Sequence, residues 1–253
     1  MSEPRTALVT GASRGLGRAT ARALARHGVR VALTYRGGAD GAVETVRTIE
    51  EEGGEAIALR LDIGDIAGFE QFAEEMTGAL RTRWRADRLD VLVNNAGVGL
   101  FDTLEDVTPR RFDEIVGTNF RGTYFLIQAL VPHLADGGRI VNVSTSLTRH
   151  VSPGTSVYAA SKAAVEAFSL SLAEELGPRG IRVNSVAPGP SATDFNGGAM
   201  RDDPALRDAL AQQTALGRVG SPDEIGDAIA ALVSPDMRWV TAERLEVSGG
   251  ALL

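Results

Sequence analysis

The sequence predicts a doubly wound α/β fold, in which seven parallel strands form one sheet and helices cover both of its faces. Three observations predict it. Short runs of β-branched and apolar residues alternate with longer segments whose apolar residues recur at helical spacing. A glycine-rich turn joins the first run to the first helical segment. The chain has 253 residues, 43% hydrophobic and 23% charged, so we expect a single domain over residues 1–253.

The predicted elements follow one another in the order strand, helix, strand. The seven strands are expected at residues 7–9, 29–33, 56–61, 89–93, 139–143, 181–186 and 245–247. The six helices between them, each with apolar residues at i, i+3 and i+4, are expected at residues 15–26, 40–52, 65–83, 109–134, 155–176 and 222–233. Right-handed crossovers place such helices on both faces of the sheet. Ligands then bind at the carboxyl ends of the strands.

One long segment, about residues 190–218, lacks clear periodicity. It contains Pro190, Gly197, Gly198 and Pro204, which interrupt regular structure. A segment of this length inside a compact domain is more often functional than accidental. We therefore predict a lid over the substrate here, with an ordinary surface excursion as the alternative.

The composition argues against several classes of partner. A net charge of −7 gives no general attraction to nucleic acid or to anionic membranes. No stretch approaches the roughly 18 apolar residues of a membrane helix, and the N-terminus has no signal-peptide core, so we expect a cytoplasmic protein. The chain has no cysteine, and His27, His133 and His150 are too scattered to suggest a metal site.

The first strand ends in the glycine-rich sequence TGASRGLG, residues 10–17. Gly11 permits a tight turn, while Gly15 and Gly17 let a pyrophosphate approach the backbone and let the helix pack close to the strand. Placement at a strand-to-helix junction is what a dinucleotide-binding Rossmann fold requires. The cofactor-binding residues predicted in this turn are Gly11, Ser13, Arg14, Gly15, Leu16 and Gly17.

The end of the second strand indicates which nicotinamide cofactor binds. An acid at this point would accept from the ribose 2′-hydroxyl and repel a 2′-phosphate, but the residues are Thr34, Tyr35 and Arg36. Arg36, together with Arg14, offers guanidinium groups to phosphate oxygens. We therefore predict NADP(H), with Tyr35 and Arg36 as cofactor-binding residues. The alternative is that both arginines are merely solvated.

Further motifs appear in order along the chain: NNAG at residues 94–97, Asn119, the sequence YAASK at residues 158–162, and Pro188-Gly189. Together with the glycine turn, they make the sequence strongly resemble the short-chain dehydrogenase/reductase family over its whole length. It is similar in particular to members that include 3-oxoacyl carrier-protein reductases, glucose dehydrogenases and polyketide ketoreductases. The resemblance implies hydride transfer between NADP(H) and a ketone or secondary alcohol.

The resemblance also implies roles for further residues. Asp62, followed by Ile63, matches the position that contacts the adenine amino group. Asn94, Ala96 and Gly97 match the loop that supports the adenine-side ribose, and Pro188-Gly189 with Thr193 matches the turn that holds the nicotinamide carboxamide. The cofactor-binding residues predicted beyond the glycine turn and the second strand are thus Asp62, Ile63, Asn95, Ala96, Gly97, Tyr158, Lys162, Pro188, Gly189 and Thr193.

Tyr158 and Lys162 are predicted to be the chemical centre. They are four residues apart in a predicted helix, so both side chains lie on one face. A tyrosine pKa of about 10 is high for proton transfer near neutrality, and we expect the Lys162 ammonium and the oxidised nicotinamide to lower it. Tyr158 would then protonate the carbonyl oxygen. The resemblance implies that Lys162 also holds the nicotinamide ribose and that Asn119 anchors a water in a proton relay.

The hydroxyl that would hydrogen-bond the substrate oxygen is less clear. The family places a serine 13 residues before the tyrosine, and this count arrives at Thr145, with Ser144 and Ser146 on either side. Threonine retains a hydroxyl that both donates and accepts. We favour Thr145 as the fourth catalytic residue, and a local shift of the loop would present Ser146 instead.

The sequence leaves the substrate open, as a small-molecule or acyl-tethered ketone. We expect pocket walls around Leu100-Phe101, residues 149–153 and residues 195–200. The competing function is a regulatory protein that binds NADPH without turnover on the same fold. Relatives are commonly tetramers, so a homo-tetramer or homo-dimer is expected, with the apolar tail Ala251–Leu253 suited to an interface.

Overall fold

Seven parallel strands form the centre of the computed structural model, which describes residues 4–99 and 101–253. Their order across the sheet is β3-β2-β1-β4-β5-β6-β7, and every neighbouring pair is parallel. The strands are β1 (Thr6–Val9), β2 (Arg30–Tyr35), β3 (Ala56–Arg60), β4 (Leu89–Asn94), β5 (Leu134–Val143), β6 (Arg182–Pro188) and β7 (Arg244–Val247). The prediction of seven parallel strands is therefore confirmed.

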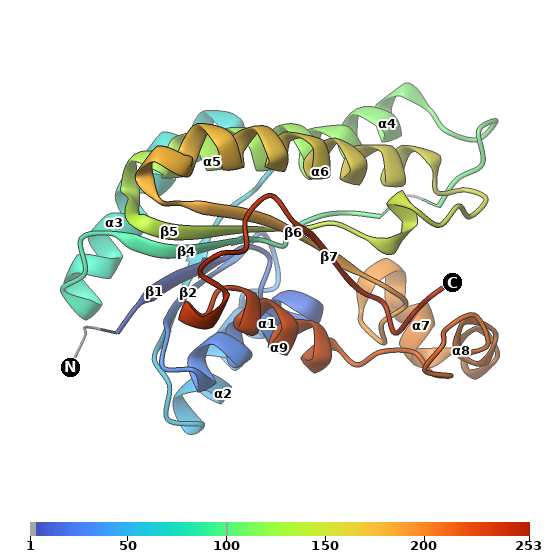
Figure 1. Ribbon diagram of the computed structural model, residues 1–253, viewed down its shortest axis with the longest axis horizontal. Helices are drawn as coiled ribbons and strands as arrows, with labels where there is room; N and C mark the ends of the chain where they lie inside the picture. The colour runs from blue at the N-terminus through green and yellow to red at the C-terminus, as the bar shows by residue number, and fades with distance from the viewer. Residues whose placement is uncertain (1–3, 100) are drawn as a thin grey trace.

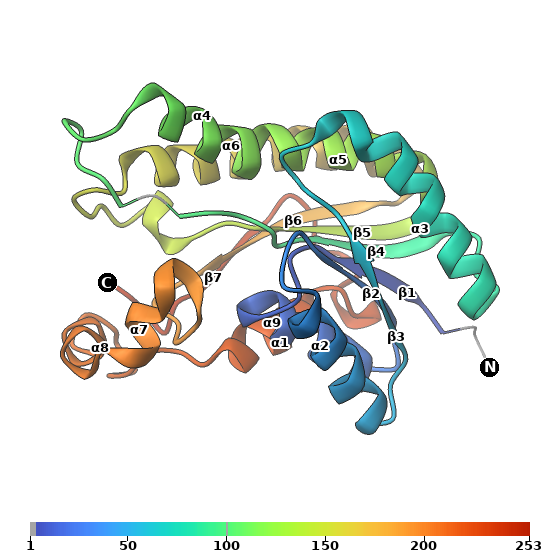
Figure 2. The ribbon, with the colours of Figure 1, turned by 180° about the vertical axis from the view of Figure 1, so that it is seen from behind.

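Helices cover both faces of the sheet, as Figures 1 and 2 show. The layer drawn above the sheet in Figure 1 consists of α3 (Phe69–Trp84), α4 (Pro109–Val116), α5 (Thr123–Leu130) and α6 (Ser156–Leu176). The opposite layer consists of α1 (Gly15–Arg26), α2 (Ala39–Glu51) and α9 (Pro222–Leu232). Two short helices, α7 (Ala199–Asp202) and α8 (Pro204–Ala211), lie beyond one end of the sheet. This arrangement confirms the doubly wound Rossmann fold.

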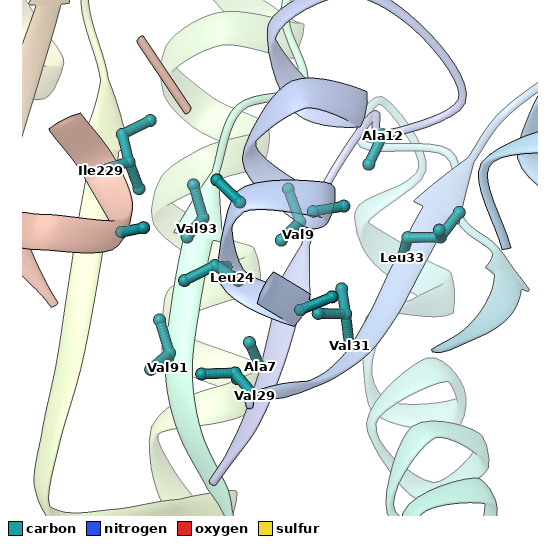
Figure 3. Close-up of a cluster of buried hydrophobic side chains, with 14 of the residues drawn as sticks. Ala7, Val9, Ala12, Leu24, Val29, Val31, Leu33, Val91, Val93 and Ile229 are labelled. Carbon is teal, nitrogen blue, oxygen red and sulfur yellow. The ribbon is translucent and has the colours of Figure 1, made fainter. Parts of the chain in front are cut away.

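Two clusters of buried apolar side chains hold the layers together. In the cluster of Figure 3, Val9, Val31 and Val93 of the sheet pack with Leu24 of α1 and Ile229 of α9. Neighbouring strand residues point to the opposite face, because side chains alternate along a strand. There the second cluster includes Leu8, Met76, Leu92, Leu126, Leu130 and Ile140. Burial of both faces explains why the strands are nearly continuous apolar runs in the sequence.

The helix predicted over residues 109–134 is not a regular α-helix. It consists of α4, a π-helical segment η2 (Gly117–Gly122), α5 and a 3₁₀ turn η3 (Val131–His133), and Leu134 already belongs to β5. Pro132 cannot donate a backbone hydrogen bond, which is consistent with the end of the helix there. In η2 the backbone of Gly122 packs so closely that an added Cβ would lie 2.2 Å from the carbonyl oxygen of Ile63.

The segment 190–218 contains more regular structure than its sequence pattern suggested. It holds a 3₁₀ turn η6 (Phe195–Gly198) as well as α7 and α8. The side chain of Asp203 accepts hydrogen bonds from the N–H groups of Ala205 and Leu206, and Pro204 occupies the first turn of α8. This Asp-Pro pair is a signal for the start of a helix, and the prediction of an irregular segment did not take it into account.

The sheet topology creates a crevice beside β1. The chain leaves β1 toward α1 on one face, whereas it leaves the adjacent β4 toward α4 and α5 on the other face. Connections that depart in opposite directions leave a gap at the carboxyl ends of the two strands, which is where such folds bind ligands. In the described residues, no helix combines the length and hydropathy needed to cross a membrane.

The close contact at Gly122 predicts a specific stability change. Gly122→Ala should lower the free energy of unfolding by about 1–3 kcal/mol, because the new methyl group has no room beside Ile63. The matched control is Gly78→Ala in α3, where nothing lies within 4 Å of the added Cβ; it should be neutral or stabilising by up to about 1 kcal/mol. Urea unfolding of both variants measures this, and equal effects would contradict the packing argument.

Candidate active site

A cavity of about 1010 Å³ opens at the carboxyl ends of the strands. Most of the predicted site residues line it. They are Gly11, Ser13, Arg14, Gly15, Leu16, Tyr35, Arg36, Asp62, Ile63, Asn95, Ala96, Gly97, Thr145, Tyr158, Lys162, Pro188, Gly189 and Thr193. Gly17 and Asn119, although predicted as site residues, do not belong to this lining.

The glycine turn leaves room for an anion at the start of α1. Gly11 and Gly15 have φ angles of +64° and +56°, a conformation that favours glycine. A Cβ on Gly11 would approach Ala96 Cα to 3.0 Å, so the turn lies directly against the loop that follows β4. The helix begins at Gly15 without a side-chain cap. Its first N–H groups are therefore available to a phosphate oxygen.

Gly17 has a packing role behind this turn. A Cβ there would lie 2.5 Å from both Asn95 Nδ2 and the carbonyl oxygen of Gly11. Asn95 Nδ2 in turn donates to the carbonyl oxygen of Thr10 at 2.9 Å, which fastens the loop after β4 to the end of β1. Asn94 is buried and donates to Asn142 Oδ1 at 2.8 Å. These asparagine side chains hold together the ends of the strands that form the cavity wall.

Two exposed arginines stand at the glycine-turn end of the cavity. Arg14 and Arg36 both line it, and within the described part of the chain neither side chain takes part in an ion pair or side-chain hydrogen bond. Asp62 uses one carboxylate oxygen to accept from the N–H of Gly64 at 2.9 Å. Arg18, which the sequence analysis missed, donates to the carbonyl oxygen of Ser13 at 2.7 Å and holds the turn.

Lys162 of α6 is buried at the other end of the cavity. Its Nζ donates to the carbonyl oxygen of Val143, the last residue of β5, at 2.8 Å. A Cβ on Gly97 would lie 3.2 Å from this Nζ, so the ammonium packs closely against the loop after β4. Burial disfavours the charged form and lowers the pKa of Lys162 to about 8.

Tyr158 lies one helical turn before Lys162 and is 7% exposed. Burial raises the pKa of Tyr158 to about 12, and interaction with the Thr145 hydroxyl lowers it in part. The net lowering expected from Lys162 together with the oxidised nicotinamide is therefore not found in this structure. Loss of solvation outweighs the stabilisation of the phenolate.

Asn119 lies in the π-helical segment and is fully buried. Its side chain accepts from the N–H of Val98 at 2.8 Å and donates to the carbonyl oxygen of Val98 at 2.9 Å. It also lies 3.1 Å from the hydroxyl of Ser161 on α6. The side chain thus joins the loop after β4 to η2 and α6.

The structure separates the three candidate hydroxyls after β5. The Ser144 hydroxyl donates to Glu166 Oε1 at 2.5 Å and is thereby engaged. Thr145 lines the cavity together with Tyr158, and its hydroxyl lowers the pKa of Tyr158 in part. Ser146 also lines the cavity. The influence on the tyrosine favours Thr145 over its two neighbours.

Aromatic and apolar side chains surround Tyr158. The ring centroids of Phe101 and Phe195 lie 6.0 and 5.9 Å from that of Tyr158. The apolar lining on this side includes Phe101, Leu147, Phe195, Met200, Leu206 and Leu210. Of the predicted wall at residues 149–153, Ser152 belongs to the lining, and Leu100 lies outside the described residues.

The base of the segment 190–218 is fastened to the body of the protein. Ser191 and Gly220 form a β-bridge, with the N–H of Ala192 donating to the carbonyl oxygen of Gly220 at 3.0 Å. Thr214 forms a second bridge with Ala251 near the C-terminus. Between these points the segment contributes Phe195, Met200, Leu206 and Leu210 to the cavity.

The chain is similar to known oxidoreductases over almost its whole length. The family model described as "Enoyl-(Acyl carrier protein) reductase" matches residues 11–251. An "uncharacterized oxidoreductase" of Methylorubrum extorquens is 40% identical over 98% of each chain. A trihydroxynaphthalene reductase of Pestalotiopsis fici is 34% identical over 99% of this chain and 90% of its own. The crystal structure of an angucycline C-6 ketoreductase with bound NADP has a TM-score of 0.92, is 42% identical and covers 98% of this chain and 95% of that one.

The buried ammonium predicts a pH-dependent difference in stability. Lys162 has a pKa of about 8 in the folded protein and 10.5 as a reference, so the unfolded chain binds more protons between these values. Relative to Lys162→Met, the parent should gain about 3 kcal/mol of unfolding free energy between pH 8 and pH 10.5. Denaturant unfolding of both proteins across this range measures the difference. A difference that stays constant with pH would contradict a buried, titrating Lys162.

Proposed function

The chain belongs to the short-chain dehydrogenase/reductase family of oxidoreductases, and we propose that it is an NADPH-dependent reductase of planar aromatic ketones. The observation that carries the proposal is the buried Tyr158 hydroxyl, which meets Thr145 and Lys162 in one cavity with the glycine turn. A proton donor and a dinucleotide cradle in the same cavity are what carbonyl reduction requires.

The residues that line the cavity fit NADPH. The open start of α1 and the close approach of Gly11 to Ala96 form a cradle for the pyrophosphate. Arg14 and Arg36 would bind the 2′-phosphate. Asp62 with Ile63 would hold the adenine end, and Pro188, Gly189 and Thr193 the nicotinamide end. When bound, NADPH supplies a hydride equivalent to the carbonyl carbon.

The residues of this chain supply the proton and hold the carbonyl. Tyr158, kept neutral by burial, donates its phenolic proton to the carbonyl oxygen as negative charge develops there. Thr145 donates a second hydrogen bond to the same oxygen and orients it. The buried Lys162 places a cation beside Tyr158 and stabilises the phenolate that remains. Asn119 would hold a relay water through its backbone, because its side chain is engaged with Val98.

The wall around Tyr158 supports an aromatic substrate. Phe101 and Phe195 flank the tyrosine, and aromatic rings stack favourably on such faces. Among the described lining residues, Arg14, Arg18 and Arg36 are the arginines, and all three serve the glycine-turn end. Apart from Lys162, the described substrate end therefore has no cation for a carboxylate or phosphate. The named activities of the angucycline and naphthalene reductases are consistent with this class. A 3-oxoacyl thioester is the competing substrate.

Two larger features accompany this function. Residues 190–218 would act as the substrate lid, since they carry Phe195 over Tyr158 while their base is fixed at Ser191 and Gly220. A homo-tetramer or homo-dimer would cover apolar surface such as Trp239, which is 97% exposed, and the terminal Leu253.

The alternative function, a non-catalytic NADPH sensor, leaves the set of Tyr158, Thr145 and Lys162 without a purpose.

The first test of this function is turnover. Absorbance at 340 nm should show NADPH oxidation with a hydroxylated naphthalenone, and slower or no oxidation with a 3-oxoacyl thioester. Tyr158→Phe should lower kcat by about 10²–10⁴-fold, because only the proton donor is lost, while the Kd for NADPH changes by less than a few-fold. NADPH binding without turnover of any ketone would favour the sensor. Turnover of the thioester alone would reject the aromatic substrate class.

The second test is cofactor preference. Charge-assisted hydrogen bonds from Arg14 and Arg36 to the 2′-phosphate, weakened by exposure, should favour NADPH over NADH by about 10–10³-fold in kcat/KM. Replacing both arginines with alanine should remove most of this preference by weakening NADPH. Arg47→Ala, an exposed arginine on α2 paired with Glu44, is the control and should change nothing. Equal use of NADH by the parent would contradict the assignment.

A further inference from the structure

The face of α6 that carries Tyr158 and Lys162 carries a third polar residue one turn further on. Tyr158, Lys162 and Glu166 are spaced by four residues, so they follow one another along one face of the helix. Glu166 is 18% exposed and forms an ion pair with Arg244, the first residue of β7, which is 10% exposed. Two oppositely charged side chains are thus largely removed from solvent just below the catalytic end of the helix.

Glu166 binds the segment that follows β5. Its Oε1 accepts from the hydroxyl of Ser144 at 2.5 Å, from the hydroxyl of Thr148 at 2.9 Å and from Arg244 Nε at 2.7 Å. Ser144 and Thr148 stand on either side of Thr145. One carboxylate oxygen therefore fixes the segment at both ends, on either side of Thr145.

Arg244 completes this attachment from the opposite side. Its Nη2 donates to the backbone carbonyl of Thr145 at 3.2 Å and to the hydroxyl of Thr148 at 2.9 Å. Its Nη1 donates to Glu246, which lies two residues further along β7 and on the same side of the strand. The planar guanidinium fork can meet all of these acceptors at once, which a lysine ammonium cannot do in a fixed geometry.

A buried ion pair contributes little net stability, because the loss of hydration offsets the attraction between the charges. Here all partners of the pair other than Glu246 lie on residues 144–148, the segment that carries the Thr145 hydroxyl. Because Glu166 and Tyr158 belong to one rigid helix, fixing the segment to Glu166 also fixes the position of the Thr145 hydroxyl relative to the Tyr158 hydroxyl.

We propose that Glu166 and Arg244 are positioning residues, which hold the segment 144–148, and with it the Thr145 hydroxyl, beside Tyr158 in the cavity. The pair does not touch the substrate and acts through residues 144–148. The catalytic consequence rests on the proposed function, whereas the effect on the placement of Thr145 beside Tyr158 does not. Misplacing an oriented group by about 1 Å can cost about 10²-fold in rate.

The placement of Thr145 beside Tyr158 is tested without turnover. In protein labelled with ¹³Cζ-tyrosine, the chain gives three NMR signals, one for each tyrosine, and Tyr158→Phe assigns that of Tyr158. Thr145→Ala defines how far the Tyr158 signal moves when the neighbouring hydroxyl is removed. Replacing the pair together, Glu166→Leu with Arg244→Met, should move it in the same direction by a similar amount. The signals of Tyr35 and Tyr124 should stay in place.

Control variants separate positioning from general destabilisation. Removing the pair Arg22 and Glu52, which joins α1 to the end of α2, should leave the Tyr158 signal at its parent position. Should the double replacement fail to fold, Glu166→Gln serves instead, because Arg244 keeps Glu246 as a partner and Gln keeps an acceptor oxygen. Its signal should move in the same direction but less far. A Tyr158 signal that stays in place when Glu166 and Arg244 are replaced, or in Thr145→Ala, overturns the proposal.

Kinetics then test the catalytic consequence. The double replacement should lower kcat/KM for the ketone by about 10–100-fold and leave the KM for NADPH within about 2-fold. In a Thr145→Ala background the same replacement should cost less than about 3-fold, because the hydroxyl that it positions is already absent. If the double replacement lowers kcat/KM by the same factor in the Thr145→Ala background as in the parent, the pair has a separate structural role and the proposal is overturned. A parent without ketone turnover, but with the NMR shifts as expected, would reject the proposed function and leave the positioning contact intact.

Discussion

The catalytic end of this molecule depends on the hydrogen bond from the buried Lys162 ammonium to the carbonyl oxygen of Val143. The bond joins the middle of α6 to the last residue of β5, so it fixes the height of the helix above the sheet. Tyr158 and Glu166 lie one turn to either side of this point. This buried contact therefore helps to set both the position of Tyr158 and that of Glu166, which holds the segment after β5. Gly97 packs closely against the same ammonium.

The order of strands and helices was predictable because the central strands β1, β2 and β4 are buried on both faces and read as apolar runs. The interruptions of the helix predicted over residues 109–134 were not predictable, because they arise from contacts between distant segments. The π-helical segment at residues 117–122 packs against the backbone of Ile63, which is more than 50 residues away along the chain. The start of α8 is different, since Asp203 and Pro204 form a local signal that was present in the sequence and was overlooked.

The candidate site was predictable where a motif carries it and unpredictable where burial decides the chemistry. The glycine turn, NNAG, Tyr158 and Lys162 meet in one cavity because parallel strands end at the same edge of the sheet. The direction of the shift in the pKa of Tyr158 depends on how completely the folded protein excludes water from it. The contact between Glu166 and Arg244 joins positions 78 residues apart, and only the four-residue spacing from Lys162 hinted at it.

The burial of Tyr158 also favours one direction of the proposed reaction, the reduction of a ketone, over the oxidation of an alcohol. With a pKa of about 12, only about one molecule in 10⁵ carries the phenolate at pH 7. Reduction of a ketone starts from the phenol, whereas oxidation of an alcohol starts from the phenolate. The folded chain therefore holds a proton ready for a product alcohol. The reverse reaction must first surrender that proton, which alkaline conditions or the positive charge of an oxidised nicotinamide would favour.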